Sequence, residues 1–271
     1  MSTWGLRQFL HHGGPSGSWG NLGLWPVSAG PHIDYALACL RLARRVGEAA
    51  GIVAGDRVLS IACGEGDELE LWRREFHAEH AIGIDPDPGA CARASAQGRS
   101  VIRGGIEQVP GDAFERVLCV DAAYHISPRS AFLRAARSAL RPGGRLAFTD
   151  LVLAAPASAA LRATARVCGI DARELLDPEA AMERIATAGF IDIRCERLDE
   201  EVLEGFARFA SLQAARLGPR RWHPAWLPAA ITAGLIPPAR ARGLGYALFS
   251  ASTAASAERT ALSSKGIPGC A

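Results

Sequence analysis

The stretch VLSIACGEGDE, residues 58–68, decides the fold, because an apolar strand pattern runs into a glycine-rich turn and then into a predicted helix. Glycines such as Gly64 and Gly66 let a backbone approach a ligand closely, and the first turn of a helix offers free N–H groups. The next apolar segment, HAIGID at residues 80–85, ends in Asp85. An acid at the tip of the second strand can accept both hydroxyls of a ribose. The two segments together predict a nucleoside-binding edge on an α/β sheet.

Apolar, β-branched segments alternate with helical segments along the rest of the chain. Strands are predicted at residues 57–62, 80–85, 100–102, 117–121, 145–153, 191–196 and 245–250. Helices are predicted at residues 33–50, 88–96, 129–140 and 178–188. This alternation is typical of a parallel sheet with helices on both faces. We therefore predict an α/β fold with a Rossmann-like, seven-stranded, mostly parallel sheet.

Composition divides the chain into five segments. They are an N-terminal arm at 1–30, the α/β core at 31–198, a helical insertion at 199–241, the last core strand and its end at 242–259, and a flexible tail at 260–271. A long insertion on a compact fold is usually functional. Because this one carries Trp222, Trp226 and a proline cluster, we interpret it as a lid over the substrate, with a dimer contact as the alternative.

The composition argues against several classes of protein. The 30 basic and 28 acidic residues leave a formal net charge of +2, which is too small to attract nucleic acid or an anionic membrane. No secretory signal is recognised at the N-terminus, and the apolar run at residues 225–239 is short and broken by prolines. The seven cysteines include no CxxC pair, which favours reduced thiols and the cytoplasm. The histidines lack a third ligand at a suitable spacing, so we expect no metal site.

An NAD-binding turn is the main competing interpretation of residues 58–68. Dinucleotide-binding turns have the spacing G-x-G-x-x-G, whereas Gly64 and Gly66 are followed by no third glycine. The downstream segment LRPGGRLAFTD, residues 140–150, is not a dehydrogenase feature either. It strongly resembles the helix–turn–strand that follows the fourth strand in class I methyltransferases dependent on S-adenosylmethionine (SAM).

Residues 31–196 resemble that superfamily through five motifs in the expected order and spacing. These motifs are VLSIACGEG, IGIDPD, GGIEQVP, DAAYHI and LRPGGRLAFTD. The resemblance is to the small-molecule branch, which includes sugar O-methyltransferases of natural-product pathways and the tocopherol-type and sterol C-methyltransferases. The segment NLGLW, residues 21–25, also resembles an arm that closes over the cofactor in this branch. The order of the motifs is specific for the superfamily but gives almost no information about the substrate.

The resemblance implies SAM as the cofactor and S-adenosylhomocysteine (SAH) as the product. It implies cofactor contacts at Gly64, Gly66, Asp85, Pro86, Ile106, Glu107 and Asp121. The two glycines would lie against the methionine part and the ribose, and Asp85 would accept the ribose hydroxyls. Pro86, Ile106 and Glu107 would lie around the adenine. The backbone from Asp121 onward would meet the sulfonium.

The sequence departs from the family pattern at several of these turns. Ser60 stands where the family usually has an acid, and Ala62 where it usually has glycine. Gly105 replaces the acid that accepts the adenine amino group, and Leu24 replaces the tyrosine of the arm. Because Asp85 is intact, we expect SAM binding to persist, with Ser60, Ala62 and backbone groups in contact with the cofactor. The lost acids leave a SAM-bound cyclase open as an alternative.

The reaction is expected beyond the carboxyl ends of the fourth and fifth strands, where ligands of open α/β sheets bind. His125 follows the fourth strand and Asp150 lies in the fifth, so we expect them to face each other across the acceptor pocket. In the resembled sugar O-methyltransferases, a His and an Asp at these positions are proposed to deprotonate the acceptor hydroxyl. Tyr124 is expected to orient the acceptor. The structural alternatives are a side chain at a strand–helix corner for His125 and a capping or loop acid for Asp150.

These residues together predict O-methylation of a small-molecule secondary metabolite, with His125 and Asp150 acting as the base. Transfer to carbon or nitrogen, a SAM-bound cyclase and a non-catalytic binding protein are the alternatives. We expect no nucleic-acid partner and no membrane partner, and a homodimer is compatible with the sequence.

Overall fold

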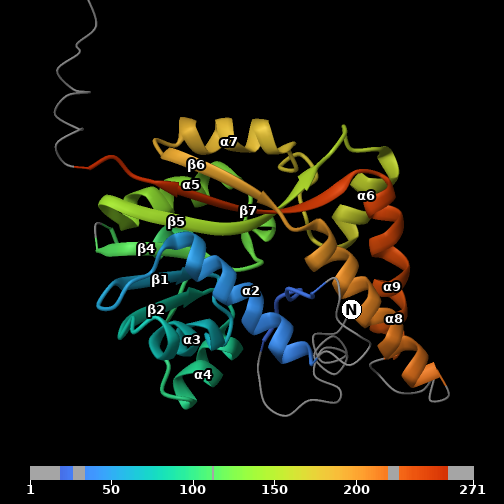
Figure 1. Ribbon diagram of the computed structural model, residues 1–271, viewed down its shortest axis with the longest axis horizontal. Helices are drawn as coiled ribbons and strands as arrows, with labels where there is room; N and C mark the ends of the chain where they lie inside the picture. The colour runs from blue at the N-terminus through green and yellow to red at the C-terminus, as the bar shows by residue number, and fades with distance from the viewer. Residues whose placement is uncertain (1–18, 27–33, 112, 219–225, 256–271) are drawn as a thin grey trace, which may run out of the picture.

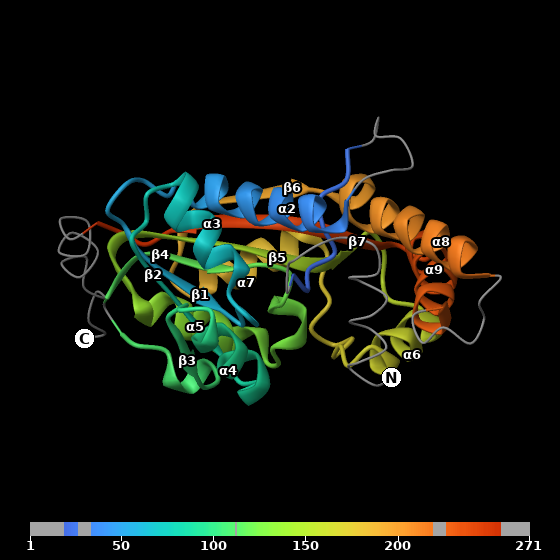
Figure 2. The ribbon, with the colours of Figure 1, turned by 90° about the horizontal axis from the view of Figure 1, so that it is seen from below.

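The strands of the core form a single sheet, covered by helices on both faces (Figures 1 and 2). The computed structural model describes residues 19–26, 34–111, 113–218 and 226–255. Trp222, most of the predicted arm and the predicted tail lie outside these residues.

The order of the strands across the sheet is β3-β2-β1-β4-β5-β7-β6. Their bounds are β1 Arg57–Ile61, β2 His80–Asp85, β3 Val101–Arg103, β4 Phe114–Cys119, β5 Leu140–Leu153, β6 Ile191–Arg197 and β7 Leu244–Ser252. Strand β7 pairs antiparallel with β5 and β6, and the pairs among the first five strands are parallel. The predicted seven-stranded, mostly parallel sheet is therefore confirmed.

Burial of both faces of the sheet explains why its central strands are apolar almost throughout. Neighbouring residues of β1 point to opposite faces, so Val58 packs in one core cluster and Leu59 in the other. Helices α2 (Tyr35–Ala50) and α3 (Asp67–Glu75) cover the first face, and α5 (Arg129–Ala139) lies on the opposite one (Figure 2). Helix α4 (Pro88–Ala96) contacts β2 and β3. Helix α7 (Pro178–Thr187) packs Ile185 into the same cluster as α5.

The turn between β1 and α3 is built from left-handed backbone. Gly66 is the N-cap of α3 with a φ of 73°, a conformation that glycine adopts without steric cost. Ala62, at the position where the family usually has glycine, also has a positive φ, of 57°. These two residues turn the chain sharply at the carboxyl end of β1, and the residues between them face the cavity described below.

The predicted insertion is helical and lies between β6 and β7. It consists of a π-helical segment (Asp199–Glu204), α8 (Gly205–Leu217) and α9 (Trp226–Ala241). Helices α8 and α9 lie side by side beyond the end of the sheet at which α2 begins (Figures 1 and 2). Helix α6 (Ala159–Val167) contacts α9. None of the helices within the described ranges is long and apolar enough to cross a membrane.

Candidate active site

A cavity of about 320 Å³ opens beyond the carboxyl ends of β1, β2 and β4. Four chain segments line it, with Trp19, Gly20, Asn21, Ala62, Cys63, Gly64, Glu65, Asp67, Glu68, Asp85, Asp87, Ala90, Val120, Asp121 and Ala122. This is the edge of an open α/β sheet at which ligands bind. The structure thus brings together the predicted turns at Gly64, Asp85 and Asp121.

The lining of this cavity is strongly acidic. Six of its residues carry carboxylates, and none of the described residues that line it is basic. Two of the acids are neutralised from outside, because Arg93 Nε lies 2.6 Å from Glu65 Oε1 and Arg99 Nη2 lies 2.7 Å from Asp67 Oδ1. The other acids leave an excess of negative charge facing the cavity, which favours a cationic ligand over an anionic one. SAM carries a sulfonium and an ammonium, so this donor set fits SAM.

Asp85 fixes the geometry between the first two turns. Its Oδ2 accepts a hydrogen bond of 2.7 Å from the Gly64 N–H, and its Oδ1 accepts one of 2.9 Å from the Asp87 N–H. The side chain lines the cavity although the residue is buried. Each carboxylate oxygen has a second lone pair, so Asp85 can accept hydroxyls of a ribose without losing its hold on the turn.

The residues predicted to lie around the adenine, Pro86, Ile106 and Glu107, are not among the residues that line the cavity. Ile106 and Glu107 form a short 3-10 turn, Ile106–Gln108, and neither side chain is part of the cavity lining. Ile106 is half-buried against the core, whereas Glu107 and Pro86 are exposed. Asp87, which the sequence analysis did not select, lines the cavity instead and caps α4 by accepting from the Gly89 N–H at 2.7 Å.

Ser60 is fully buried at the end of β1 and donates a hydrogen bond of 3.0 Å to Glu68 Oε1. Glu68 lies in the first turn of α3 and lines the cavity. Burial raises the pKa of Glu68 to about 7. The sequence analysis did not select Glu68, because an acid in the first turn of a helix is usually solvent-exposed and interacts favourably with the helix dipole.

Asp121 is the centre of a buried cluster after β4. Its Oδ1 accepts hydrogen bonds from the hydroxyls of Tyr124, at 2.8 Å, and Tyr246, at 2.6 Å. Its backbone N–H donates to Thr149 Oγ1 at 2.8 Å. Burial raises the pKa of Asp121 to about 6, although these hydrogen bonds oppose the rise. Tyr246 and Thr149 were not predicted from the sequence, since each reads as one more residue of a buried strand.

The N-terminal segment closes one wall of the cavity and is bonded to this cluster. The Leu22 N–H donates to Asp121 Oδ2 at 2.5 Å, and the Trp25 N–H donates to the carbonyl of Glu201 at 2.8 Å. The Trp25 ring is stacked on Phe209 of α8, with 4.9 Å between the ring centroids. Residues 19–26 therefore connect the cavity to the helical insertion.

His125 and Tyr124 follow Asp121 on the 3-10 turn Ala123–His125. Tyr124 is buried, while His125 is exposed and its ring centroid lies 4.5 Å from that of Tyr124. Partial desolvation lowers the pKa of His125 below its ordinary value. This shift favours the neutral imidazole, the form that can accept a proton.

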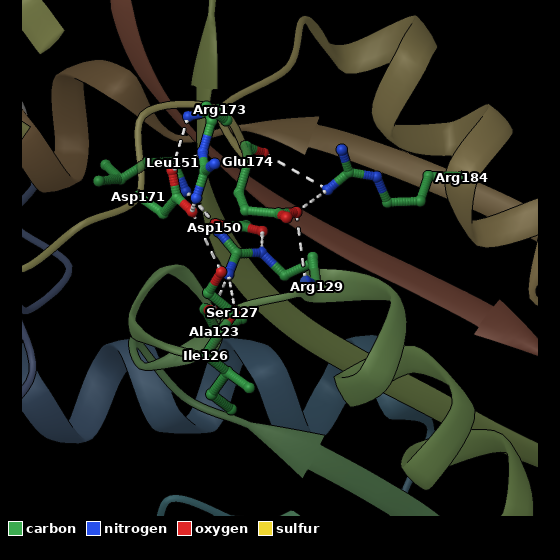
Figure 3. A network of polar contacts seen from close by, with 10 residues as sticks. All are labelled: Ala123, Ile126, Ser127, Arg129, Asp150, Leu151, Asp171, Arg173, Glu174 and Arg184. Atoms are coloured by element: carbon green, nitrogen blue, oxygen red, sulfur yellow. Dashed lines mark hydrogen bonds and ion pairs between the residues drawn. The ribbon is translucent and has the colours of Figure 1, made fainter.

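Asp150 contacts Arg129 rather than His125 (Figure 3). The guanidinium donates from Nε to Asp150 Oδ2 at 2.6 Å and from Nη2 to Oδ1 at 3.1 Å. Its Nη1 donates to the carbonyls of Ala123 and Ile126. Burial raises the pKa of Asp150, and the adjacent Arg129 charge opposes that rise. Arg129 binds both oxygens of the Asp150 carboxylate, and no hydrogen bond between Asp150 and His125 is present among the described residues. That the two residues face each other across the acceptor pocket stays a prediction.

Further polar contacts attach Arg129 and its loop to the 171–174 segment. Glu174 Oε2 accepts from the Arg129 backbone N–H at 3.2 Å and from Arg184 Nη1 at 2.6 Å (Figure 3). The Ser127 hydroxyl donates to Asp171 at 3.3 Å. The loop that carries Tyr124 and His125 is therefore attached both to β5 and to the 171–174 segment.

Comparison with known proteins agrees with this geometry. A family model described as a methyltransferase domain matches residues 59–148. Over 214 residues the chain is 29% identical to erythromycin 3″-O-methyltransferase of Saccharopolyspora erythraea, an alignment that covers 72% of this chain and 69% of that protein.

Solved structures show the same fold at lower sequence identity. The 4+2 cyclase SpnF superposes with a TM-score of 0.71 at 21% identity, covering 93% of this chain and 92% of that one. The cyclopropane synthase MmaA2 from Mycobacterium tuberculosis superposes with a TM-score of 0.69 at 16% identity, covering 93% of this chain and 98% of that one. These likenesses establish the fold that the strand order had indicated.

Proposed function

The chain belongs to the class I SAM-dependent methyltransferases, and we propose that it methylates a hydroxyl group of a small secondary metabolite. SAM, when bound, supplies an activated methyl group as a sulfonium. The similarity to an erythromycin O-methyltransferase supports an acceptor of natural-product type. The acid-lined cavity supports tight binding of the charged cofactor and weaker binding of SAH, which lacks the sulfonium charge.

The position of His125 carries the proposal for a hydroxyl acceptor. Asp121 and Ala122 line the cavity, and the backbone N–H of His125 donates to the Ala122 carbonyl at 3.0 Å. A neutral imidazole thus lies one turn from the cofactor cavity, on a loop held by Arg129. His125 can take the proton that the acceptor hydroxyl loses as its oxygen forms the new bond to the methyl carbon. Positioning supplies the rest of the rate, since methyl transfer is an in-line displacement.

In this proposal Asp150 acts through Arg129. Its carboxylate holds the guanidinium that binds the carbonyls of Ala123 and Ile126, and so it orients the loop that carries His125. Tyr124 is held by Asp121, and its ring lies next to the imidazole at a tilt of 56°, which fits a residue that orients His125 and the acceptor. Asp150 is then a positioning residue rather than a second base.

The test is a product analysis with SAM and a panel of alcohols, phenols and amines. Methylation predicts a product heavier by one methylene and one equivalent of SAH for each product molecule. A product of unchanged mass, formed while SAM remains intact, would favour a SAM-bound cyclase. Methylated amines with no methylated alcohols or phenols would favour a nitrogen acceptor.

We also propose that the insertion at 199–241 covers the acceptor. It follows β6 and precedes β7, and Trp25 connects α8 to the cavity wall. Trp226 at the start of α9 is half-buried against the apolar core, which suits a partly apolar acceptor beside these helices.

A further inference from the structure

Ser60 and Glu68 form a pair that the family pattern does not contain. Ser60 occupies the strand position where an acid is usual, and its hydroxyl donates to Glu68, which lies eight positions later on α3. Both residues are buried, at 0% and 8% exposure, and Glu68 lines the cavity. A carboxylate is therefore present beside the end of β1, although the strand itself no longer supplies it.

The start of α3 explains how Glu68 reaches this position. Gly66, in left-handed conformation, begins the helix immediately before Asp67 and Glu68. Side chains of a helix lean toward its N-terminus, so Glu68 points back over the turn and toward β1. The free N–H groups of the first turn favour a negative charge at this place.

Glu68 differs from the other acids of the cavity in its partners. Glu65 and Asp67 are paired with arginines, Asp85 accepts two backbone N–H groups, and Asp121 accepts two tyrosine hydroxyls. Glu68, like Asp85, Asp87 and Asp121, forms no ion pair with any described residue, and its hydrogen bonds come from the Ser60 hydroxyl and its own backbone. A buried carboxylate without a cation is costly, which indicates that a ligand provides one.

We infer that Glu68 binds the ammonium group of the methionine part of SAM, in place of the acid that the family usually carries on β1. The Gly64–Gly66 turn, against which the methionine part is expected, leads directly into Glu68. The ammonium is the cationic group at the far end of that part, whereas the sulfonium is expected at the end of β4. The assignment concerns the cofactor, so it holds whichever reaction follows.

Binding of two probes to the full chain, measured by calorimetry, tests this assignment. SAH contains the ammonium, while 5′-methylthioadenosine has the same nucleoside and thioether but no amino-acid end. Glu68→Gln should weaken SAH binding about 10- to 100-fold, the usual worth of a charge-assisted hydrogen bond, and leave 5′-methylthioadenosine binding unchanged. Glu70→Gln is the matched control, because Glu70 lies on the same helix outside the cavity lining.

Equal weakening of both probes would overturn the inference, because it would mean that Glu68 supports the turn rather than the ammonium. An unchanged affinity for SAH would overturn it as well.

A swap variant, Ser60→Asp with Glu68→Ser, returns the carboxylate to the strand. We expect it to recover SAH affinity to within a few-fold of the wild type, with 5′-methylthioadenosine binding again unchanged. A folded swap variant that binds SAH as weakly as Glu68→Gln would contradict the claim that the two positions serve the same ligand group.

Discussion

Arg129 joins Asp150 of β5 to the loop after β4 by a buried bidentate ion pair, with Nε to Oδ2 at 2.6 Å and Nη2 to Oδ1 at 3.1 Å. The remaining nitrogen of the guanidinium donates to the carbonyls of Ala123 and Ile126. One side chain therefore sets the distance between two neighbouring strand ends. The loop that it holds carries the proposed base.

Removing one partner of this pair should destabilise the fold strongly. Asp150→Ala leaves the Arg129 charge buried, at 3% exposure, which should cost about 3–5 kcal/mol in the free energy of unfolding. The double variant Arg129→Met with Asp150→Leu should cost less, because no buried charge is left unpaired. Urea unfolding measures the free energy of unfolding of the single and the double variant. A double variant less stable than Asp150→Ala would mean that the carbonyl contacts of Arg129 matter more than its ion pair.

His125→Ala should lower kcat by about 10²–10⁴ on a hydroxyl acceptor, the usual contribution of a positioned general base. Desolvation lowers the His125 pKa below its ordinary value, and only the neutral imidazole accepts a proton. The rate of the wild type should therefore fall as the pH drops through this pKa, and that acidic limb should vanish in His125→Ala. SAH affinity should be unchanged. A wild-type kcat in His125→Ala would favour an acceptor that needs no base.

Asp150→Asn separates a positioning role from a catalytic one. It should lower kcat by loosening the loop, yet keep the acidic limb of the pH profile at the same pH, because His125 still titrates. Loss of that limb in Asp150→Asn would indicate that Asp150 shares the proton with His125 directly.

Asp85→Ala should weaken SAH and 5′-methylthioadenosine to the same extent, about 10- to 100-fold, since both ligands contain the ribose. It should also lower the melting temperature, because Asp85 accepts the N–H groups of Gly64 and Asp87. Calorimetry and thermal unfolding measure the two effects. An unchanged affinity for either ligand would exclude a ribose contact at Asp85.

The pKa of Glu68 predicts opposite effects of pH on stability and on binding. Burial raises that pKa from its ordinary 4.5 to about 7 in the free protein, so the folded state binds more protons than the unfolded one between these values. The contribution of Glu68 to stability is present below pH 4.5 and is lost as the pH rises through 7. SAH affinity should instead increase over the same rise to pH 8, because an ammonium prefers the ionised carboxylate.

Glu68→Gln should abolish both trends and leave the free protein at least as stable as the wild type at pH 8. Parallel melting and binding series at several pH values check this. A binding curve that keeps its pH dependence in Glu68→Gln would place the titrating group elsewhere, with Asp121 the next candidate because its pKa is about 6.

Hydrogen exchange tests the proposed cover at 199–241. Protection in this segment should increase when a cofactor and an acceptor are both present, while strand β1 should exchange equally slowly in both states. Unchanged protection would favour a fixed contact between two copies of the chain.

Periodicity and motif order were sufficient to predict the sheet, because each buried strand shows its apolar pattern locally. The packing face of α2 was less well determined. Leu37 lies at helical spacing with Leu40 and Ala43, which predicts a buried position. In the structure Leu37 is 42% exposed, whereas Ala38, Cys39 and Leu42 are buried. Small residues fit closely against the sheet and the N-terminal segment, and apolarity alone does not reveal that fit.

The polar partners of the site could not be predicted from spacing. Asp150 and Arg129 lie 21 positions apart and Tyr246 lies 125 positions from Asp121. Each contact depends on how strands far apart in the sequence are ordered in the sheet. Asp85 and Gly64 were predicted together because the first two strands of this fold are neighbours and their turns meet at one edge.

The reversed direction of β7 has a consequence for how such a chain can diversify. Because β7 runs antiparallel to β5 and β6, the connection from β6 leaves and re-enters the sheet at the edge that carries the cavity. Insertions and deletions there would change the proposed cover of the acceptor without altering any strand pairing. New acceptor specificities can therefore be selected by exchanging one contiguous piece of the gene, while the cofactor half of the protein stays constant.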